Sequence, residues 1–341
     1  MDYSKKISVV MSTYNTPVPI LKEAVESILN QTLTDFEFII IDDGSTDDSR
    51  DYLAALQDNR IRLIHNSENI GLTKSLNIGL WAAKGKYIAR MDSDDISMPT
   101  RFEKQYDYME HHPNVIMCGS RVSYIGNRKG TSSGKWRRKF ENMDDYRVRL
   151  LFSNPGPHHP TFFMRHEMLK RHGIMYDENL RYAQDYGMNT VLCRYGDVVT
   201  LDDPLVLYRI HDSQITTAKK EKQLQCDKLI MKGLLTELLG VVSAEEVDFH
   251  LFYSKGLYRK AAVISPDVAA WYKRLLKANS RLKIYNQRKL RRHIEYIERR
   301  LIVHAFSDKM SVIEKLSLAI HYVSPVSVLM MLVESYAGSY D

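Results

Sequence analysis

The sequence predicts an α/β domain with a mostly parallel sheet, followed by an all-helical region. Over the first hundred residues, short apolar runs typical of strands alternate with apolar residues at helical spacing. Beyond about residue 217, only the helical spacing remains. Charge also divides the chain, because residues 251–310 hold 15 Lys and Arg but 4 Asp and Glu, a net charge of +11 against +6 for the whole chain. An acidic-leaning front and a basic back suggest that the two parts have different partners.

The first four predicted strands are separated by three predicted helices. Residues 7–11 form a β-branched run, and residues 36–41 are almost continuously apolar, as in a parallel strand buried on both faces. A helix is predicted between them, because residues 20–29 have helical spacing and two prolines precede them. The alternation continues with a helix at 49–56, a strand at 61–64, a helix at 73–83 and a strand at 86–89.

The later elements follow a looser pattern. Helices are predicted at 100–111 and 186–195, strands at 115–118, 161–164 and 198–201, and a basic loop rich in Gly and Ser at 126–140. Helical segments are then predicted at 219–240, 244–262, 266–279, 281–304 and 309–322. Ser243 and Glu246 form a candidate capping box. The expected division is an α/β domain at 1–217 and a helical region at 218–341.

The composition is that of an ordinary globular protein of one or two domains. The chain has 341 residues, of which 44% are hydrophobic and 26% charged. The apolar stretch at 323–333 contains a proline and is too short to span a bilayer. The N-terminus lacks the apolar run of a signal peptide, and three scattered cysteines suit a reducing compartment. We therefore expect a cytoplasmic protein without disulfides or a zinc site.

Polar clusters follow three predicted strands at the position where each strand ends. They are Thr13-Tyr14-Asn15, Asp42-Asp43, and the run that contains Asp92, Asp94 and Asp95. In an open parallel sheet, ligands bind at the carboxyl ends of the strands, so these clusters mark the expected site. Neither a dinucleotide-binding glycine fingerprint nor a P-loop is present.

Three aspartates in four positions repel one another unless a cation lies among them. Oxygen ligands favour Mg²⁺ or Mn²⁺ over a soft metal. The alternative is a surface turn in which Asp95 caps the helix after Pro99, because Asp is also a common turn and cap residue. The spacing alone leaves both interpretations open.

Several motifs in order resemble the family 2 glycosyltransferases with a GT-A fold. They are TYN after the first strand, FIIIDDGSTDDS, the N-x-G-L-x-x-S-L-N-x-G-L run at 69–80, YIARMDSDD, PHHPTFFMR at 157–165, AQDY at 183–186 and YRIHDSQ at 208–214. The likeness covers about residues 5–217 and is strongest to bacterial enzymes that extend lipooligosaccharide, capsule or O-antigen chains. It implies a nucleotide-binding half at about 1–98 and an acceptor half at about 99–217.

The resemblance implies roles for the residues of the nucleotide-binding half. Asp43 is similar to the family's base-binding aspartate, which accepts from uracil N3–H, and Thr13, Tyr14 and Asn15 would line the same pocket. Asp92 resembles the first Asp of the D-x-D pair, which reaches the ribose or the donor sugar. Asp94 resembles the second, which holds Mn²⁺ or Mg²⁺ on the diphosphate.

Further metal ligands are implied with less definition. Asp95 is a neighbour of the D-x-D pair, and Asp92 is a further candidate ligand. His211 resembles a family position that completes the metal shell, and its alternative is an ordinary histidine in a polar loop.

In the acceptor half, Asp185 resembles the general base that takes the acceptor hydroxyl's proton in an inverting transfer. The family usually has Glu-Asp here, whereas this chain has Gln184-Asp185. The alternative is that Asp185 only caps the following helix. His158 and His159 are candidates for acceptor or donor contacts, with a structural role as the alternative. Trp136, in the basic loop, is a candidate for stacking on a sugar, with the loop acting as a lid or as a solvated loop.

In the helical region, cations alternate with apolar residues at 272–277 and 288–293. This pattern favours peripheral contact with anionic lipid, with a solvated helix face and a nucleic-acid contact as alternatives. No nucleic-acid module accompanies the charge, so we expect no nucleic-acid partner. The segment 310–333 could pack on these helices, lie on the bilayer or form a homo-oligomer contact.

We therefore expect a metal-dependent, inverting glycosyltransferase that moves a hexose or N-acetylhexosamine from a UDP-sugar to a glycan or lipid-linked glycan at the bacterial surface. One rival is a sugar-nucleotide nucleotidyltransferase, but such an enzyme needs a glycine- and basic-rich segment after the first strand to hold a triphosphate, and STYNTPVPI has none. Another is a glycan-binding scaffold with a degenerate transferase domain, although Asp43, Asp92, Asp94, Asp185 and His211 are all present.

Overall fold

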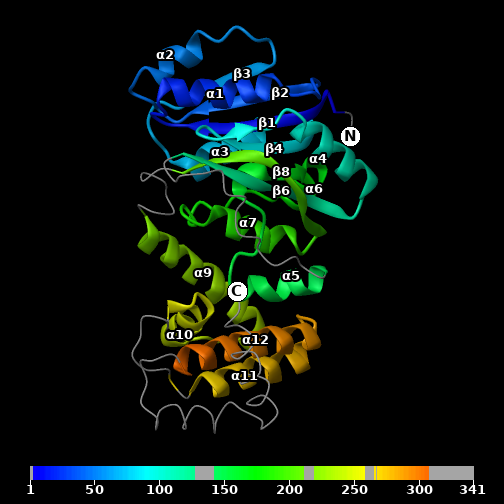
Figure 1. Cartoon of the computed structure of the whole chain (residues 1–341), viewed down its shortest axis with the longest axis vertical. Helices are drawn as coiled ribbons and strands as arrows, with labels where there is room; N and C mark the ends of the chain where they lie inside the picture. The colour runs from blue at the N-terminus through cyan, green and yellow to red at the C-terminus, as the bar shows by residue number, and fades with distance from the viewer. Residues whose placement is uncertain (1–2, 127–141, 211–218, 258–264, 266, 307–341) are drawn as a thin grey trace, which may run out of the picture. The chain divides into compact units, whose positions relative to one another are not determined.

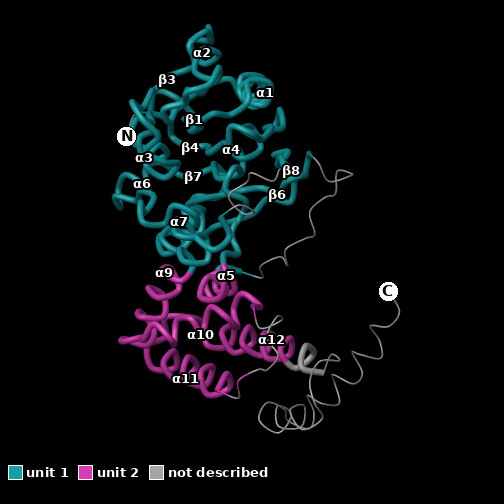
Figure 2. The backbone as a smooth tube through the Cα atoms, turned by 90° about the vertical axis from the view of Figure 1, so that its left-hand side faces the viewer, with its two compact units in different colours: residues 1–143, 154–227 teal, residues 144–153, 228–341 magenta. Residues whose placement is uncertain are grey.

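The structure is a computed structural model that describes residues 3–126, 142–210, 219–257, 265 and 267–306 (Figure 1). The chain forms two compact units (Figure 2). Unit 1 comprises Met1–Met143 and Asn154–Asp227, and unit 2 comprises Asp144–Ser153 and Lys228–Asp341. Unit 1 contains the sheet, whereas the described part of unit 2 is helical.

The sheet of unit 1 has eight strands in the order β3-β2-β1-β4-β7-β6-β8-β5. The first four in this order are parallel to one another, as predicted. Because β7 is antiparallel to both β4 and β6, and β8 is parallel to β6, β8 points the same way as β4. The strands are β1 Lys5–Thr13, β2 Phe36–Asp42, β3 Ile61–His65, β4 Gly85–Asp92, β5 Ile96–Ser97, β6 Val115–Gly126, β7 Phe163–Arg165 and β8 Asp197–Ile210.

Helices pack on the parallel strands β1, β2 and β4 and on β6 beyond them. The predicted α/β class is therefore confirmed. α3 packs on β1 and β2, α4 on β6, and α6 on β4. The helically spaced apolar residues of α1 are fully buried in the core against β1 and β2. The helices of unit 1 are α1 Val18–Leu29, α2 Ser49–Ala54, α3 Leu72–Ala82, α4 Arg101–His111, α6 His166–His172 and α7 Gln184–Leu192, with a short 3₁₀ turn, η1, at His159–Thr161.

β8 is longer than the predicted strand, which ended at Leu201 because Asp202, Asp203 and Pro204 follow it. These residues are unfavourable in a regular strand. The register of β8 against β6 shifts at this point, so the strand continues past the three residues to Ile210.

The ends of β1, β2, β4 and β8 lie along one edge of the sheet, the carboxyl edge. Thr13 is opposite Asp42, and Ser12 is opposite Asp92, so the three predicted polar clusters are neighbours. The segment before β7 reaches the same edge, because the Arg90 backbone N–H donates to the Phe162 carbonyl at 2.9 Å. Five segments far apart in the sequence therefore meet there.

The loop at residues 66–71 packs on Gly44, just beyond β2. Gly44 has φ +74°, and a Cβ atom on it would lie 2.5 Å from the Glu68 carbonyl carbon and 2.8 Å from the Asn69 nitrogen. Only glycine satisfies both requirements without moving the loop.

Unit 2 combines the C-terminal helices with residues 144–153, which the sequence analysis placed in the α/β domain. Tyr146, Val148 and Phe152 of this segment are almost fully buried, and the ring of Phe152 packs on Tyr272 and His293.

None of the described helices is long and apolar enough to cross a membrane. The helices are α5 Met143–Leu150, α9 Lys220–Leu239, which begins in unit 1, α10 Ala244–Ser254, α11 Asp267–Leu282 and α12 Gln287–Phe306. The predicted capping box of Ser243 and Glu246 opens α10.

A buried histidine connects residues 144–153 to α10 and α11. His250 Nε2 lies 2.8 Å from the Leu151 carbonyl oxygen, and the Trp271 indole donates to His250 Nδ1 at 3.1 Å. These partners fix a neutral ring with its proton on Nε2. Burial lowers the pKa of His250 to about 4, because a charged ring would lose its hydration here.

We expect Gly44→Ala to lower the free energy of unfolding by about 1–3 kcal/mol, through the clash with the 66–71 loop in addition to the backbone strain. Gly173→Ala is the matched control, because Gly173 also has a positive φ, +60°, but nothing within 4 Å of its Cβ position. Urea unfolding of both variants measures the difference. Equal losses in the two variants would show that the 66–71 loop does not depend on Gly44.

We expect the free energy of unfolding to fall as the pH drops from about 6.5 toward 4, by up to about 3 kcal/mol from His250 alone. The unfolded histidine binds its proton near pH 6.5, whereas the folded one resists protonation until about pH 4. His250→Gln should be less stable at neutral pH but lose this part of the pH dependence. Tryptophan fluorescence during urea unfolding measures both, and His111→Gln, at an exposed position, is the control that should keep it.

Candidate functional site

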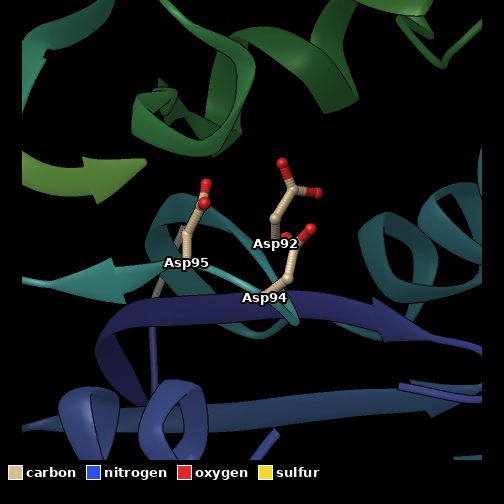
Figure 3. A group of neighbouring side chains, drawn as sticks. All are labelled: Asp92, Asp94 and Asp95. Carbon is tan, nitrogen blue, oxygen red and sulfur yellow. The ribbon is translucent and has the colours of Figure 1, made fainter. Parts of the chain in front are cut away.

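Asp92, Asp94 and Asp95 form a carboxylate cluster, the aspartate triad, in the turn from β4 to β5. One ligand oxygen from each residue lies within 4.8 Å of those of the other two. Figure 3 shows that the three side chains point to the same side of the chain. The side chain of Asp92 is partly exposed, whereas Asp95 is buried. The turn thus concentrates up to three negative charges at the carboxyl edge.

Arg90 provides the first compensation for these charges. Its guanidinium is buried and pairs with both carboxylate oxygens of Asp92. Burial raises the pKa of Asp92, and the charge of Arg90 opposes this rise. Arg90 Nε is buried and has no hydrogen-bond partner among the described residues. Asp92 is therefore held in a fixed orientation by a planar, two-point contact.

One carboxylate oxygen of Asp95 accepts a hydrogen bond, and the other accepts none from the described residues. Its Oδ1 accepts from the Arg209 backbone N–H at 2.8 Å, whereas its buried Oδ2 has no partner in the described part of the chain. Burial, together with the charges of Asp92 and Asp94, raises the pKa of Asp95 well above its usual range. A cation at the triad would meet oxygen ligands only, would reduce this repulsion and would give Asp95 Oδ2 a partner. The residues present thus fit a Mg²⁺ or Mn²⁺ ion.

The alternative role of Asp95 as a helix cap does not match the structure. α4 begins at Arg101, and its N-cap is Thr100, without a side-chain hydrogen bond. The carboxylate of Asp95 contacts Arg209 on β8 instead.

Arg209 also binds the neighbouring turn residue, and the sequence analysis did not single it out. Its Nε donates to the Asp94 carbonyl at 2.8 Å, and its guanidinium pairs with Glu23 on α1. Arg209 therefore fixes the backbone of the triad from the neighbouring strand. The signal was available, since Arg209 lies in the YRIHDSQ motif.

The second polar cluster centres on Asp43, which is 2% exposed. Its carboxylate accepts three hydrogen bonds from the 66–71 loop, donated by Asn66 Nδ2 at 2.8 Å, Ile70 N at 3.0 Å and Gly71 N at 2.9 Å. A carboxylate has about four acceptor positions, so one remains for a further donor.

The TYN residues border Asp43. Asn15 has a positive φ and exchanges hydrogen bonds with Ser45 and Thr46 beyond β2. The Thr13 hydroxyl donates to Thr16, whose oxygen lies 2.9 Å from Ser93 Oγ in the triad turn. Tyr14 is 47% exposed. The structure therefore brings the predicted nucleotide-binding residues to one edge, beside the triad.

Asp185 lies in the first turn of α7, where its Oδ2 accepts from Asn154 Nδ2 at 2.7 Å. The N-cap of α7 is Ala183, without a side-chain hydrogen bond, so the capping alternative is not what the structure has. The charge of Asp185 contributes to the raised pKa of Asp92, so the two carboxylates are near enough to interact.

Asn154 has a fixed orientation, because its Oδ1 accepts from Gly156 N at 3.1 Å and from Asn189 Nδ2 at 3.0 Å. Its amide group must therefore face Asp185 as a donor. Sequence reasoning missed Asn154, which precedes the PHHP motif without a signal of its own.

The two candidate histidines have aromatic surroundings. His159 Nε2 lies 2.9 Å from the Tyr176 hydroxyl, and Asn77 of α3 hydrogen-bonds both the N–H and the C=O of Tyr176. Burial lowers the pKa of His159 well below its usual value, so this ring is neutral. His158 packs against the rings of Tyr124 and Tyr208. Both histidines lie just before β7, at the carboxyl edge.

Two candidate residues, His211 and Trp136, lie outside the described residues. So do most of the basic loop and the segment 310–333.

Comparison with known proteins identifies the family. The sequence model of glycosyl transferase family 2 matches residues 8–173. An uncharacterized glycosyltransferase of Haemophilus influenzae is 32% identical over 254 residues, which cover 72% of this chain and 78% of the relative. The amylovoran biosynthesis glycosyltransferase AmsE of Erwinia amylovora is 32% identical over 238 residues, 66% of this chain and 86% of AmsE.

Solved structures support the same fold. S. aureus TarS in complex with UDP-GlcNAc superposes with a TM-score of 0.59 at 18% sequence identity, covering 93% of this chain and 91% of that one. Sequence relatives, family match and fold agree with one another. The chain belongs to glycosyl transferase family 2 and is a glycosyltransferase with a GT-A-like α/β fold.

Proposed function

We propose that this enzyme transfers a hexose or N-acetylhexosamine from a UDP-sugar to a growing bacterial surface glycan, with inversion at the anomeric carbon and with a divalent metal ion. The observation that carries the proposal is the common edge of Asp43, the aspartate triad and Asp185. The name of AmsE supports a polysaccharide acceptor, and the UDP-GlcNAc complex of TarS supports a UDP-sugar donor.

The nucleoside binds beside Asp43. The remaining acceptor position of its carboxylate receives the N3–H of uracil, and the three hydrogen bonds from the 66–71 loop hold the carboxylate in place. Thr13, Tyr14 and Asn15 line this pocket, and Tyr14 has the exposed ring that a base can contact.

The diphosphate binds over the aspartate triad. Asp94 and Asp95 hold Mn²⁺ or Mg²⁺, with His211 as a further ligand, and Asp92 contacts the ribose or the donor sugar from its position on Arg90. The metal supplies charge neutralisation for the leaving UDP. Arg209 holds the backbone of Asp94 and the carboxylate of Asp95 while the ligand enters and leaves.

Asp185 acts as the general base. Asn154 donates to Oδ2 and holds the carboxylate of Asp185 in place. As the acceptor oxygen forms its bond to the anomeric carbon, its proton passes to Asp185, and the bond to the UDP oxygen breaks on the opposite face. His158 and Trp136 are the proposed contacts for the acceptor or for a closing lid.

The acceptor is a glycan or a lipid-linked glycan, and the enzyme works in the cytoplasm at the inner face of the membrane. The exposed cations of α11 and α12 support contact with anionic lipid. The three free, buried cysteines are consistent with a reducing compartment.

We expect Asp185→Asn to lower kcat for transfer at least about a hundredfold, the usual contribution of a general base, while leaving the affinity for UDP with Mn²⁺ unchanged. Release of UDP from a panel of UDP-sugars in the presence of acceptor glycans measures the first, and calorimetric titration measures the second. Asp107→Asn, an exposed aspartate on α4, is the matched control. A fully active Asp185→Asn variant would remove the proposed base without affecting membership of the family.

We expect Mn²⁺ to raise the affinity of the wild-type enzyme for UDP at least about tenfold, and Asp94→Asn to abolish this increase, because the variant loses one of the ligands and one charge of the triad. Calorimetric titration with UDP, with Mn²⁺ or with EDTA, measures both. Asp47→Asn, which lies outside the triad, should keep the increase. Metal-independent binding of UDP by the wild type would contradict the proposed metal site.

A further inference from the structure

The turn between α11 and α12 exposes two aliphatic side chains. Leu282 is 56% exposed and Ile284 is 41% exposed. The apolar residues of both helices on either side of the turn are buried, for example Leu275 and Leu290. We call residues 281–286 the α11–α12 tip. Its exposed side chains lie two residues apart, so they form one small apolar patch.

Hydrogen bonds from a buried asparagine fix the backbone conformation of this tip. The buried Asn279 donates to the Tyr285 carbonyl at 2.9 Å and to Gln287 Oε1 at 2.6 Å, and its Oδ1 accepts from Tyr285 N at 2.8 Å. Lys283 takes up a left-handed conformation, φ 55°, which reverses the chain. Tyr285, next to Ile284 in the sequence, is buried. The hydrogen bonds thus hold a conformation that keeps Leu282 and Ile284 in solvent.

Four exposed cations lie within a few residues of these side chains in the sequence: Lys277, Arg281, Lys283 and Arg288. Within the part of the chain that the structure describes, none of the four has an acidic partner within 4.0 Å, whereas nearby Arg274 is paired with Glu246. The carboxylate of Asp144, from the segment 144–153, accepts a hydrogen bond from the Asn286 side chain in this turn. The patch is therefore apolar at its centre and positive around it.

We propose that the α11–α12 tip inserts into the headgroup region of an anionic bilayer, with Leu282 and Ile284 at the acyl boundary and the four cations on lipid phosphates. This inference rests on the membrane contact in the proposed function and assigns it to particular residues. A bilayer surface offers both chemistries at once, because phosphates lie directly above hydrocarbon. Two aliphatic side chains are too few for a stable interface with a second copy, which needs a much larger buried area.

The test is flotation of the full chain with vesicles of equal parts phosphatidylglycerol and phosphatidylcholine, and with vesicles of phosphatidylcholine alone. We expect the wild type to bind the anionic vesicles. The double variant Leu282→Ser/Ile284→Ser should bind them at least about tenfold more weakly. The triple variant Arg281→Gln/Lys283→Gln/Arg288→Gln should lose the preference for anionic lipid and the sensitivity of binding to salt.

The matched control is Leu229→Ser/Val241→Ser, which removes two exposed aliphatic side chains elsewhere in unit 2, 53% and 92% exposed. It should bind as the wild type does. Thermal unfolding and release of UDP from a UDP-sugar should be unchanged in all the variants, which separates loss of membrane binding from loss of folding or catalysis.

Three outcomes would overturn the inference. Equal vesicle binding by the wild type and the Leu282→Ser/Ile284→Ser variant would move the membrane contact to another part of the chain. Absence of vesicle binding by the wild type would remove the membrane contact altogether, yet leave the sugar transfer intact. A wild-type dimer in light scattering that the double variant converts to a monomer would assign the tip to a second copy.

Discussion

Mutual repulsion among three carboxylates is the constraint on which the arrangement of unit 1 depends. Oxygens of Asp92, Asp94 and Asp95 lie within 4.8 Å of one another, at the end of a buried strand. Arg90 neutralises the first, and Arg209 binds the turn from β8. Behind them, the buried Arg101 donates to the Arg90 carbonyl at 2.8 Å, and burial lowers its pKa to about 9. Arg90 lies on β4 itself, whereas the sheet brings Arg209 to the triad, because β8 ends at the same edge as β4.

The same edge explains why the site needs so many segments. Parallel strands provide the ends of β1, β2 and β4 side by side, and the antiparallel β7 brings the segment before it to the same edge. α7 contributes Asp185 from the acceptor half. In the proposed function, the chemistry of the transfer is divided among groups that hold the nucleoside, groups that hold charge and one group that receives a proton. Each is fixed by a separate local network, so each can be altered on its own.

Much of this could be predicted from the sequence. The alternating periods indicated the strands and helices of the first hundred residues, and the rule that ligands bind at the carboxyl ends of strands was enough to group Asp43 with the triad. The role of Asn154 could not be predicted in the same way, because its partner Asp185 lies 31 residues away and no motif marks Asn154. Arg90 and Arg209 lie within the YIARMDSDD and YRIHDSQ motifs, but the sequence does not show that both contact the triad. Residues 144–153 could not be grouped with the C-terminal helices from the sequence for a related reason: the partners that bury them come a hundred residues later.

The long separation between residues 144–153 and their partners affects how the protein is made. Leu151 leaves the ribosome 99 residues before His250, which lies on its carbonyl oxygen. At about 5–20 residues per second, the segment at 144–153 waits on the order of 5–20 s for its partners. Throughout that interval, Tyr146, Val148 and Phe152 lack the C-terminal partners that bury them, and for part of it β7 and β8 of the sheet are still to be made. Truncation of the chain after β8 would leave the apolar side chains of residues 144–153 permanently without these partners.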